Sequence, residues 1–245
     1  MQIRKHKNLE PNLWDENNIL RQPVRDILLK VVESYIESIK KISHVNIDES
    51  DIKDVFVYGS CASYFYNNKS DIDMCIVINP NSIAAKNEGM NVMHNFKLYY
   101  YNWAITHHCK IYGRSIDVSF EDVKKTDTYK RYRSGPCFSI MKNEWTFEPV
   151  VISDSEFKKI QSDANLVYKQ IMSDYRKTKR NGFKSAEVKK LYSDIYASKN
   201  LTHEENIEQP VTYMYIAFRR IRNRGIINKL RDKIVEFESK DFVLK

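Results

Sequence analysis

The sequence predicts an α+β fold in which a sheet with flanking helices is followed by a helical domain. Short apolar runs that end at turn-forming residues are typical of buried strands, and two such runs occupy residues 55–58 and 74–78. Two further arms, 109–112 and 115–120, meet at a Gly113-Arg114 pivot and predict a hairpin. Because only helical patterns follow Ser153, we predict two domains, residues 1–152 and 153–245.

The remaining elements of the first domain follow from the spacing of apolar residues. Between Arg21 and Ser43 these residues recur every three or four positions, which predicts a helix with Pro23 in its first turn. Residues 61–66 have room for about two helical turns between the two strands. Aromatic residues at helical spacing predict a further helix over 91–107, and apolar runs at 138–141 and 145–150 predict a second hairpin.

The second domain is predicted to contain four helices. Apolar stripes cover 157–175 and 188–195. Pro210 is expected to open the third helix, which Gly225 closes after Arg224, and a last stripe covers 227–237.

Composition narrows the class of protein. The 245 residues are 42% hydrophobic, enough for a buried core, and no run of about 18 apolar residues or signal-peptide pattern occurs. We therefore expect an intracellular, cytoplasmic protein without a membrane segment. The four cysteines are far apart and lack a CxxC pair, so we expect reduced thiols rather than disulfides or a zinc site. A net charge of +8 is compatible with an anionic partner.

Three aspartates are the candidate chemical groups. Asp71 and Asp73 are two positions apart at the start of a predicted strand and therefore project from the same face. Their like charges require neutralisation, and a hard divalent cation such as Mg²⁺ provides it best. Asp117 alternates with apolar residues in the same way on a neighbouring strand and can supply a third carboxylate, so that two metal ions could be held.

The segment before these carboxylates suits a phosphate group. Gly59 permits a sharp turn and a close approach, and Ser60 offers a hydroxyl. The short helix predicted after them would present free N–H groups and the positive end of its dipole. Together these features predict that a nucleotide binds with its phosphates on the turn and its metal ions on the carboxylates.

This arrangement resembles the DNA polymerase beta-like nucleotidyltransferase superfamily. The similarity rests on VFVYGS at 55–60, SDIDMCIVI at 70–78 and SIDVSF at 115–120, and covers about the first 120 residues. The layout, with its KIYGRSIDVSF hairpin and FRRIRNRGIINKL helix pair, also resembles predicted nucleotidyltransferases of bacteriophage genomes.

The resemblance implies a mixed sheet, two Mg²⁺ or Mn²⁺ ions and a metal-dependent transfer of NMP from an NTP, such as ATP, to a hydroxyl. Asp71 and Asp73 would bind both ions, whereas Asp117 would bind the catalytic ion and can accept the hydroxyl proton. Gly59 and Ser60 would hold the β and γ phosphates, and Ser70 is counted with them as a nucleotide contact.

Basic stretches in the helical half indicate the acceptor. Residues 176–190 and 218–225 could line the cleft opposite the carboxylates, and Arg219 and Arg222 are the predicted phosphate contacts among Arg219, Arg220, Arg222 and Arg224. The leading acceptor is an RNA 3′ end such as that of tRNA. The plainer interpretation of both stretches is a solvated helix face.

Several alternatives stay open at this stage. The acceptor could be a protein side chain, as in AMPylation, or a small molecule, and the protein could be a catalytically silent nucleotide-binding module. A glycosyltransferase also uses Asp-x-Asp, but it does not need the Gly-Ser turn. Ser63, Tyr64 and Asn67 either line the nucleotide pocket or pack in the fold, and His94, His107 and His108 lack the spacing of a zinc motif. The preferred base and the oligomeric state do not follow from the sequence.

Overall fold

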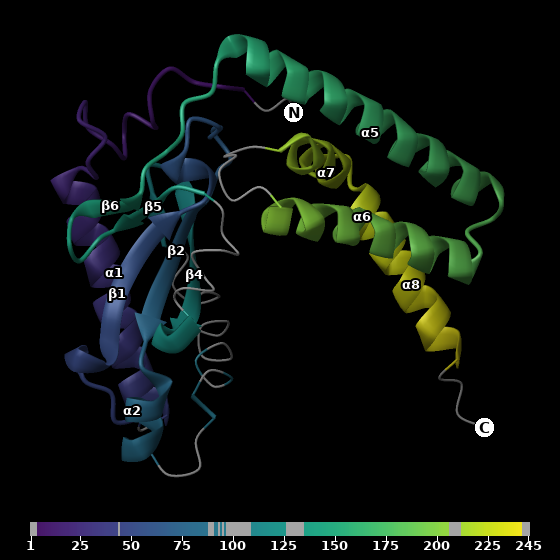
Figure 1. Ribbon diagram of the computed structural model, residues 1–245. Helices are drawn as coiled ribbons and strands as arrows, with labels where there is room; N and C mark the ends of the chain where they lie inside the picture. Colours follow the sequence, from purple (N-terminus) through teal and green to yellow (C-terminus); the bar gives the residue numbers. More distant parts are fainter. Residues whose placement is uncertain are drawn as a thin grey trace. The chain divides into compact units, whose positions relative to one another are not determined.

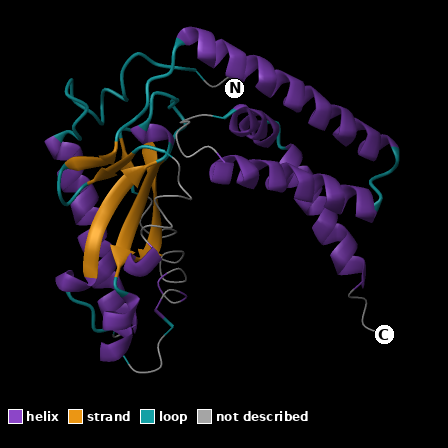
Figure 2. Ribbon diagram, viewed as in Figure 1, coloured by secondary structure: helices purple, strands orange, loops and turns teal. Residues whose placement is uncertain are grey.

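The computed structural model describes residues 4–43, 45–87, 91, 92, 94, 96, 109–125, 135–205 and 212–241. The chain divides into two compact units, one formed by residues 4–151 and the other containing residues 152–245. The first unit contains the sheet, and the described part of the second is helical (Figures 1 and 2).

The sheet is mixed, which confirms the predicted α+β fold class. In the described part of the chain, six strands lie in the order β3-β4-β2-β1-β5-β6, and β2 pairs with β4 in parallel while the other pairs are antiparallel. The strands are β1 (Ile52–Tyr58), β2 (Ile72–Ile78), β3 (Lys110–Ile111), β4 (Arg114–Asp122), β5 (Cys137–Ser139) and β6 (Glu144–Phe147).

Both predicted central strands are confirmed, and each extends further toward its N-terminus than its apolar run. The extension of β1 includes Asp54, which is buried. Its carboxylate accepts hydrogen bonds from the Ser139 hydroxyl at 2.7 Å and from the backbone N–H of Val55 at 2.7 Å. A charged residue can therefore lie inside this strand, because Oδ1 accepts both hydrogen bonds and Oδ2 lies 4.0 Å from the ammonium of Lys142.

One face of the sheet packs on helix α1 (Gln22–Ser43), the helix predicted from the apolar stripe. The Tyr35 ring lies 5.1 Å from the ring of Phe120 on β4, and its hydroxyl donates to the backbone carbonyl of Phe96. Arg25 donates to the carbonyls of Ile140 and Met141, which fixes the turn after β5. Helix α2 (Pro80–Lys86) follows β2 directly. Of the helix predicted over 91–107, residues 93, 95 and 97–107 lie outside the described residues.

Both predicted hairpins form, with changes in detail. The turn between β3 and β4 consists of Tyr112 and Gly113, whose φ values are 48° and 77°, so the predicted Gly113-Arg114 pivot is wrong by one residue. Arg114 is instead the first residue of β4 and is buried. The β5–β6 hairpin has shorter arms than predicted, with residues 140–143 in its turn.

The two-turn helix predicted after β1 is wrong. Only a single 3-10 turn forms there, Ser60–Ala62, and Ser63 is already extended. The Ser63 hydroxyl donates to the Ser60 carbonyl and accepts the N–H of Phe65, while the Cys61 carbonyl accepts the indole N–H of Trp14. These contacts use groups that a continuing helix would need for its own hydrogen bonds.

The described part of the second unit consists of α5 (Asp154–Arg180), α6 (Ser185–Glu205), α7 (Tyr213–Asn223) and α8 (Ile226–Asp241). Ser153 caps α5 by accepting the N–H of Glu156, and Thr212 caps α7 in the same way. The third helix therefore begins at Tyr213, later than the predicted start at Pro210, which lies outside the described residues. Gly225, with φ of 70°, follows α7 as predicted.

The helical unit has its own apolar core, whose fully buried members include Val188, Ile221 and Leu230. No helix in the described part of the chain combines the length and the apolar character required to cross a membrane.

Candidate active site

Two of the three predicted aspartates lie side by side on the sheet. In the parallel pairing of β2 with β4, Asp73 is in register with Asp117. Since side chains alternate along a strand and Phe120 faces α1, both aspartates project from the opposite face. Asp73 is half-buried, and Asp117 is exposed. Asp71 is exposed and comes immediately before β2.

Gly59 brings the Gly-Ser turn against one of these carboxylates. Its φ of 76° and ψ of −153° belong to a region that residues with a Cβ rarely adopt. A Cβ at this position would lie 2.1 Å from Oδ2 of Asp73. The glycine therefore permits a close approach, and the group that approaches it in this structure is the Asp73 carboxylate, whereas the predicted approach of a phosphate stays a prediction.

The dipole expected behind this turn is absent, because a three-residue 3-10 turn has too few aligned peptides to act as a helix N-terminus. The Ser60 carbonyl accepts both the N–H and the hydroxyl of Ser63. The predicted contacts of Gly59 and Ser60 with phosphates stay predictions that rest on the turn itself.

The apolar surroundings of the aspartate pair come from the same face of the sheet. Phe56, Cys75, Val77 and Cys137 form a buried cluster against which Tyr58 packs. Tyr58 pairs with Asp73 across the β1–β2 ladder, and its hydroxyl lies 3.2 Å from the Ser119 hydroxyl. Sequence reasoning did not single out Tyr58, although its place at the end of the apolar run before Gly59 was a usable signal.

The aspartates have the chemistry of a divalent-metal site but do not form a closed cluster. Within the described residues, no group of three or more His, Cys, Asp or Glu side chains could hold a metal ion. The side-by-side pair of Asp73 and Asp117 offers the carboxylate oxygens that Mg²⁺ prefers. Asp71 as the third ligand, and two bound ions, stay predictions.

Cys61 is a buried thiol close to this acidic site. Burial raises the pKa of its thiol to about 12, Arg114 opposes that shift, and Asp73, Glu10 and Asp71 add to it. The thiol is therefore protonated near neutral pH. None of the four cysteines, all of which lie in the described part of the chain, takes part in a disulfide.

The other residues predicted to meet the nucleotide in the sheet unit contribute to the loop between β1 and β2. Ser70 is 2% exposed, its hydroxyl accepts the N–H of Asn67, and its carbonyl accepts from Arg114. Ser63 and Tyr64 are buried, in agreement with a packing role. The predicted contact of Ser70 with a nucleotide stays a prediction.

Of the predicted arginines in the helical unit, Arg219, Arg220 and Arg222 lie on α7, and Arg224 is the C-cap residue that follows it. Arg219 donates to the Tyr215 hydroxyl at 2.7 Å and lies over its ring, and Arg222 is exposed. Arg220 donates to Asn165, and Arg224 lies over the ring of Tyr168. Their predicted contacts with a triphosphate stay predictions. His94 has no metal-binding cluster around it among the described residues, while His107 and His108 lie outside them.

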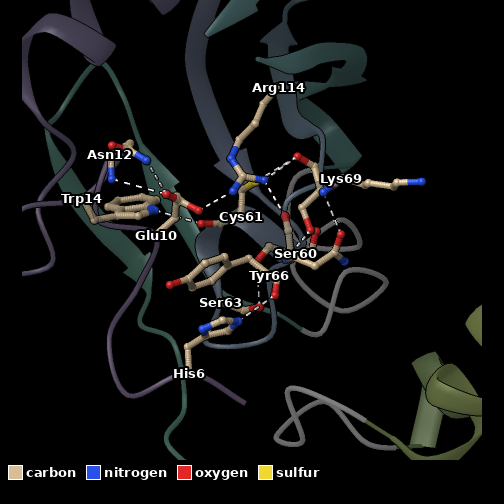
Figure 3. Close-up of polar contacts among 12 residues, drawn as sticks. His6, Glu10, Asn12, Trp14, Ser60, Cys61, Ser63, Tyr66, Lys69 and Arg114 are labelled. Atoms are coloured by element: carbon tan, nitrogen blue, oxygen red, sulfur yellow. Dashed lines mark hydrogen bonds and ion pairs between the residues drawn. The ribbon is translucent and has the colours of Figure 1, made fainter. Parts of the chain in front are cut away.

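Sequence reasoning missed a network that joins the N-terminal segment to the loop between β1 and β2 (Figure 3). Arg114 forms a buried ion pair with Glu10 and donates to the carbonyls of Asn67 and Ser70. Leu9, Leu13 and Trp14 are all buried, and their apolar character was a signal that this segment packs in the fold. No sequence pattern pointed to Glu10 and Arg114 as partners, since 104 positions separate them.

Comparison with known proteins finds one family for the sheet unit. Residues 9–115 match the model of the central palm domain of mitochondrial-like poly(A) RNA polymerases, a nucleotidyltransferase family. No curated protein matches the chain. The match covers less than half of the 245 residues; it includes Glu10, Gly59, Asp71, Asp73 and Arg114, and ends two residues before Asp117. The first unit is thus similar to a nucleotidyltransferase palm domain, which supports nucleotidyl transfer as the general activity.

Proposed function

We propose that the protein is a metal-dependent nucleotidyltransferase that moves an NMP from an NTP to the hydroxyl of an acceptor, with an RNA 3′ end as that acceptor. The observation that carries the proposal is the register of Asp73 with Asp117 on neighbouring parallel strands, beside a glycine whose backbone lies against Asp73. The palm-domain match of residues 9–115 supports the same chemistry independently.

In this reaction the acceptor oxygen attacks the α-phosphorus of the NTP. The bond from that phosphorus to the bridging oxygen of the β-phosphate breaks, and pyrophosphate leaves with the bonding electrons. Asp117 accepts the proton of the attacking hydroxyl. Asp71, Asp73 and Asp117 would hold Mg²⁺, which supplies positive charge to the phosphate oxygens when bound. Gly59 and Ser60 would hold the β and γ phosphates at the turn.

Two features favour RNA as the acceptor. The matching family acts as poly(A) RNA polymerases, which also makes ATP the first donor to test. The end of α5 and the start of α6 carry exposed basic side chains, a surface suited to a phosphate backbone. Its members are Arg176, Lys177, Lys179, Arg180, Lys184, Lys189 and Lys190.

The test compares wild type with Asp73→Asn, Asp117→Asn and the control Asp122→Asn. Asp122 lies on the same strand as Asp117, five positions along, and accepts the N–H of Lys124. Each protein is incubated with one α-³²P NTP, Mg²⁺ or Mn²⁺, and either total RNA, purified tRNA or a lysate protein fraction. RNA and protein are then separated on gels.

We expect label in RNA with wild type and with Asp122→Asn, and a loss of about 100-fold or more in the two site variants, because each removes a charge that faces the triphosphate. Label in protein would overturn RNA as the acceptor while keeping the transfer chemistry. Metal-dependent label in no fraction, or undiminished label with both site variants, would overturn the proposed reaction at this site.

A further inference from the structure

We propose that Glu10 and Arg114 are positioning residues that hold the loop between β1 and β2, and with it Asp71 and Asp73, against the strand that carries Asp117. The inference rests on the proposed function for its effect on the reaction. Its structural basis is independent of that function, because it concerns how one buried ion pair joins three separate segments of the sheet unit.

Arg114 connects the two strands of the candidate site. It is the first residue of β4, three positions before Asp117, and its guanidinium reaches across to the neighbouring loop. One nitrogen, Nη1, donates to the carbonyl of Asn67 at 2.6 Å and to that of Ser70 at 2.9 Å. These carbonyls belong to the last residues before Asp71, so the guanidinium fixes the backbone at the entry to the Asp-x-Asp segment.

Glu10 completes the contact from the N-terminal segment. Its Oε2 bonds Nη2 of Arg114, and its Oε1 accepts the side-chain N–H of Asn12 at 2.9 Å. The side chains of Glu10 and Arg114 are only 5% and 8% exposed. A buried guanidinium without a counter-charge is strongly unfavourable, so Arg114 can occupy this buried position only because the Glu10 carboxylate neutralises it.

The N-terminal segment holds the same loop at further points (Figure 3). The indole of Trp14 donates to the Cys61 carbonyl at 2.8 Å. The backbone N–H of His6 donates to the Tyr64 carbonyl, and the His6 ring stacks on that of Tyr66 with centroids 4.0 Å apart. The loop is thus bonded at successive positions from the Gly-Ser turn to Asp71.

The Glu10–Arg114 pair contributes more to the positions of the groups that it contacts than to the free energy of folding. Buried ion pairs give little net free energy of folding because desolvation offsets their attraction. A guanidinium, however, presents its donors in a fixed planar fork, which sets the positions of two carbonyls and one carboxylate at once. Lysine keeps the charge but lacks the fork, so Arg114→Lys separates geometry from charge.

The experiment uses the full chain with Glu10→Gln, Arg114→Lys and the milder Asn12→Ala. The matched control is Asp51→Asn, which removes a second ion pair, that of Asp51 with Lys86, at the other end of β1. Measurements are thermal stability, hydrogen exchange of the amides of residues 62–71, Mn²⁺ affinity by titration calorimetry, and kcat and KM for NTP transfer.

We expect Glu10→Gln and Arg114→Lys to speed exchange in residues 62–71 and to lower Mn²⁺ affinity and kcat about tenfold or more, as for outer partners of metal ligands. Asn12→Ala should change the same quantities less, and Asp51→Asn should lower stability without changing them. The inference is overturned if Glu10→Gln and Arg114→Lys fold and keep the wild-type hydrogen exchange and Mn²⁺ affinity. If these two variants do not fold, the same result with Asn12→Ala overturns it. Exchange and Mn²⁺ binding report on the pair even if no NMP transfer occurs, so failure of the proposed function would show separately.

Discussion

At the scale of single residues, the backbone conformation of Gly59 determines whether the Asp73 carboxylate can occupy its place in the proposed metal site. Replacement by alanine places a Cβ 2.1 Å from Oδ2 of Asp73 and 3.0 Å from its Cγ, in addition to the strain of a φ of 76°. The carboxylate is the group that can move, because it is half-buried and can rotate about its side-chain bonds, whereas the backbone of Asp73 is held in β2. We therefore expect Gly59→Ala to displace the proposed metal ligand.

Gly113→Ala is the control for that substitution, since Gly113 has a φ of 77° but no atom lies within 4 Å of the place that its Cβ would take. Both variants should lose about 1–3 kcal/mol of stability through strain. Only Gly59→Ala should also lose metal-dependent transfer, by about 100-fold, in the assay with α-³²P NTP. Equal activities of the two variants would show that metal-dependent transfer does not require the Asp73 carboxylate at its present position.

At the scale of the elements, the start of β1 is stabilised by Asp51, the last residue of the 3-10 turn Glu49–Asp51. Burial alone would raise the pKa of Asp51, but the backbone N–H of Asp48 and the ammonium of Lys86 outweigh it and hold that pKa below 3.8. The folded state therefore keeps the charged form longer than the unfolded state does. This contribution to stability is present above pH 3.8 and is lost as the pH falls through the lower, folded value.

Asp51→Asn should consequently be less stable than wild type by about 1–3 kcal/mol near neutral pH, because it removes hydrogen bonds to a charged group. The difference should shrink as the pH falls below 3.8 and through the lower, folded pKa, where the wild-type carboxyl takes up its proton. Urea unfolding at a series of pH values measures it. A difference that stays constant down to about pH 2 would contradict the assigned shift.

The same scale shows how far sequence patterns predict this molecule. Helices with long apolar stripes were predicted because burial of one face imposes a period of 3.6 on the sequence, and the central strands because burial of both faces gives a continuous apolar run. The segment 60–66 broke the pattern because hydrogen bonds from Trp14 and Ser63, rather than periodicity, determine its backbone. The Asp73–Asp117 pairing followed from motif order, whereas the Glu10–Arg114 contact depends on tertiary structure alone.

At the scale of the whole molecule, each of the two units has its own core and carries a different part of the proposed function. The aspartates lie in the sheet unit, and the basic surface at the end of α5 and start of α6 lies in the helical unit. The family match ends within the sheet unit, so the helical unit must be tested by its own substitutions. Its basic residues also have a plainer explanation. Lys177, Lys179 and Arg180 lie in the last turn of α5, where their positive charges stabilise the helix by interacting with the negative end of its dipole.

The salt dependence of RNA affinity distinguishes two roles of the basic surface, RNA binding and stabilisation of α5. Lys177→Gln/Arg180→Gln removes two exposed charges near the end of α5, and the control Lys158→Gln/Lys159→Gln removes two near its beginning. Each charge that binds a phosphate of single-stranded RNA contributes about 0.7 to the slope of log K against log salt concentration. The first variant should therefore bind RNA more weakly and lower that slope by about 1.4, measured by fluorescence anisotropy from about 50 to 300 mM KCl. The control should keep the wild-type slope, and helix content by circular dichroism should be unchanged in both. If the two variants bind RNA alike at every salt concentration, the end of α5 serves the helix alone and RNA is bound elsewhere.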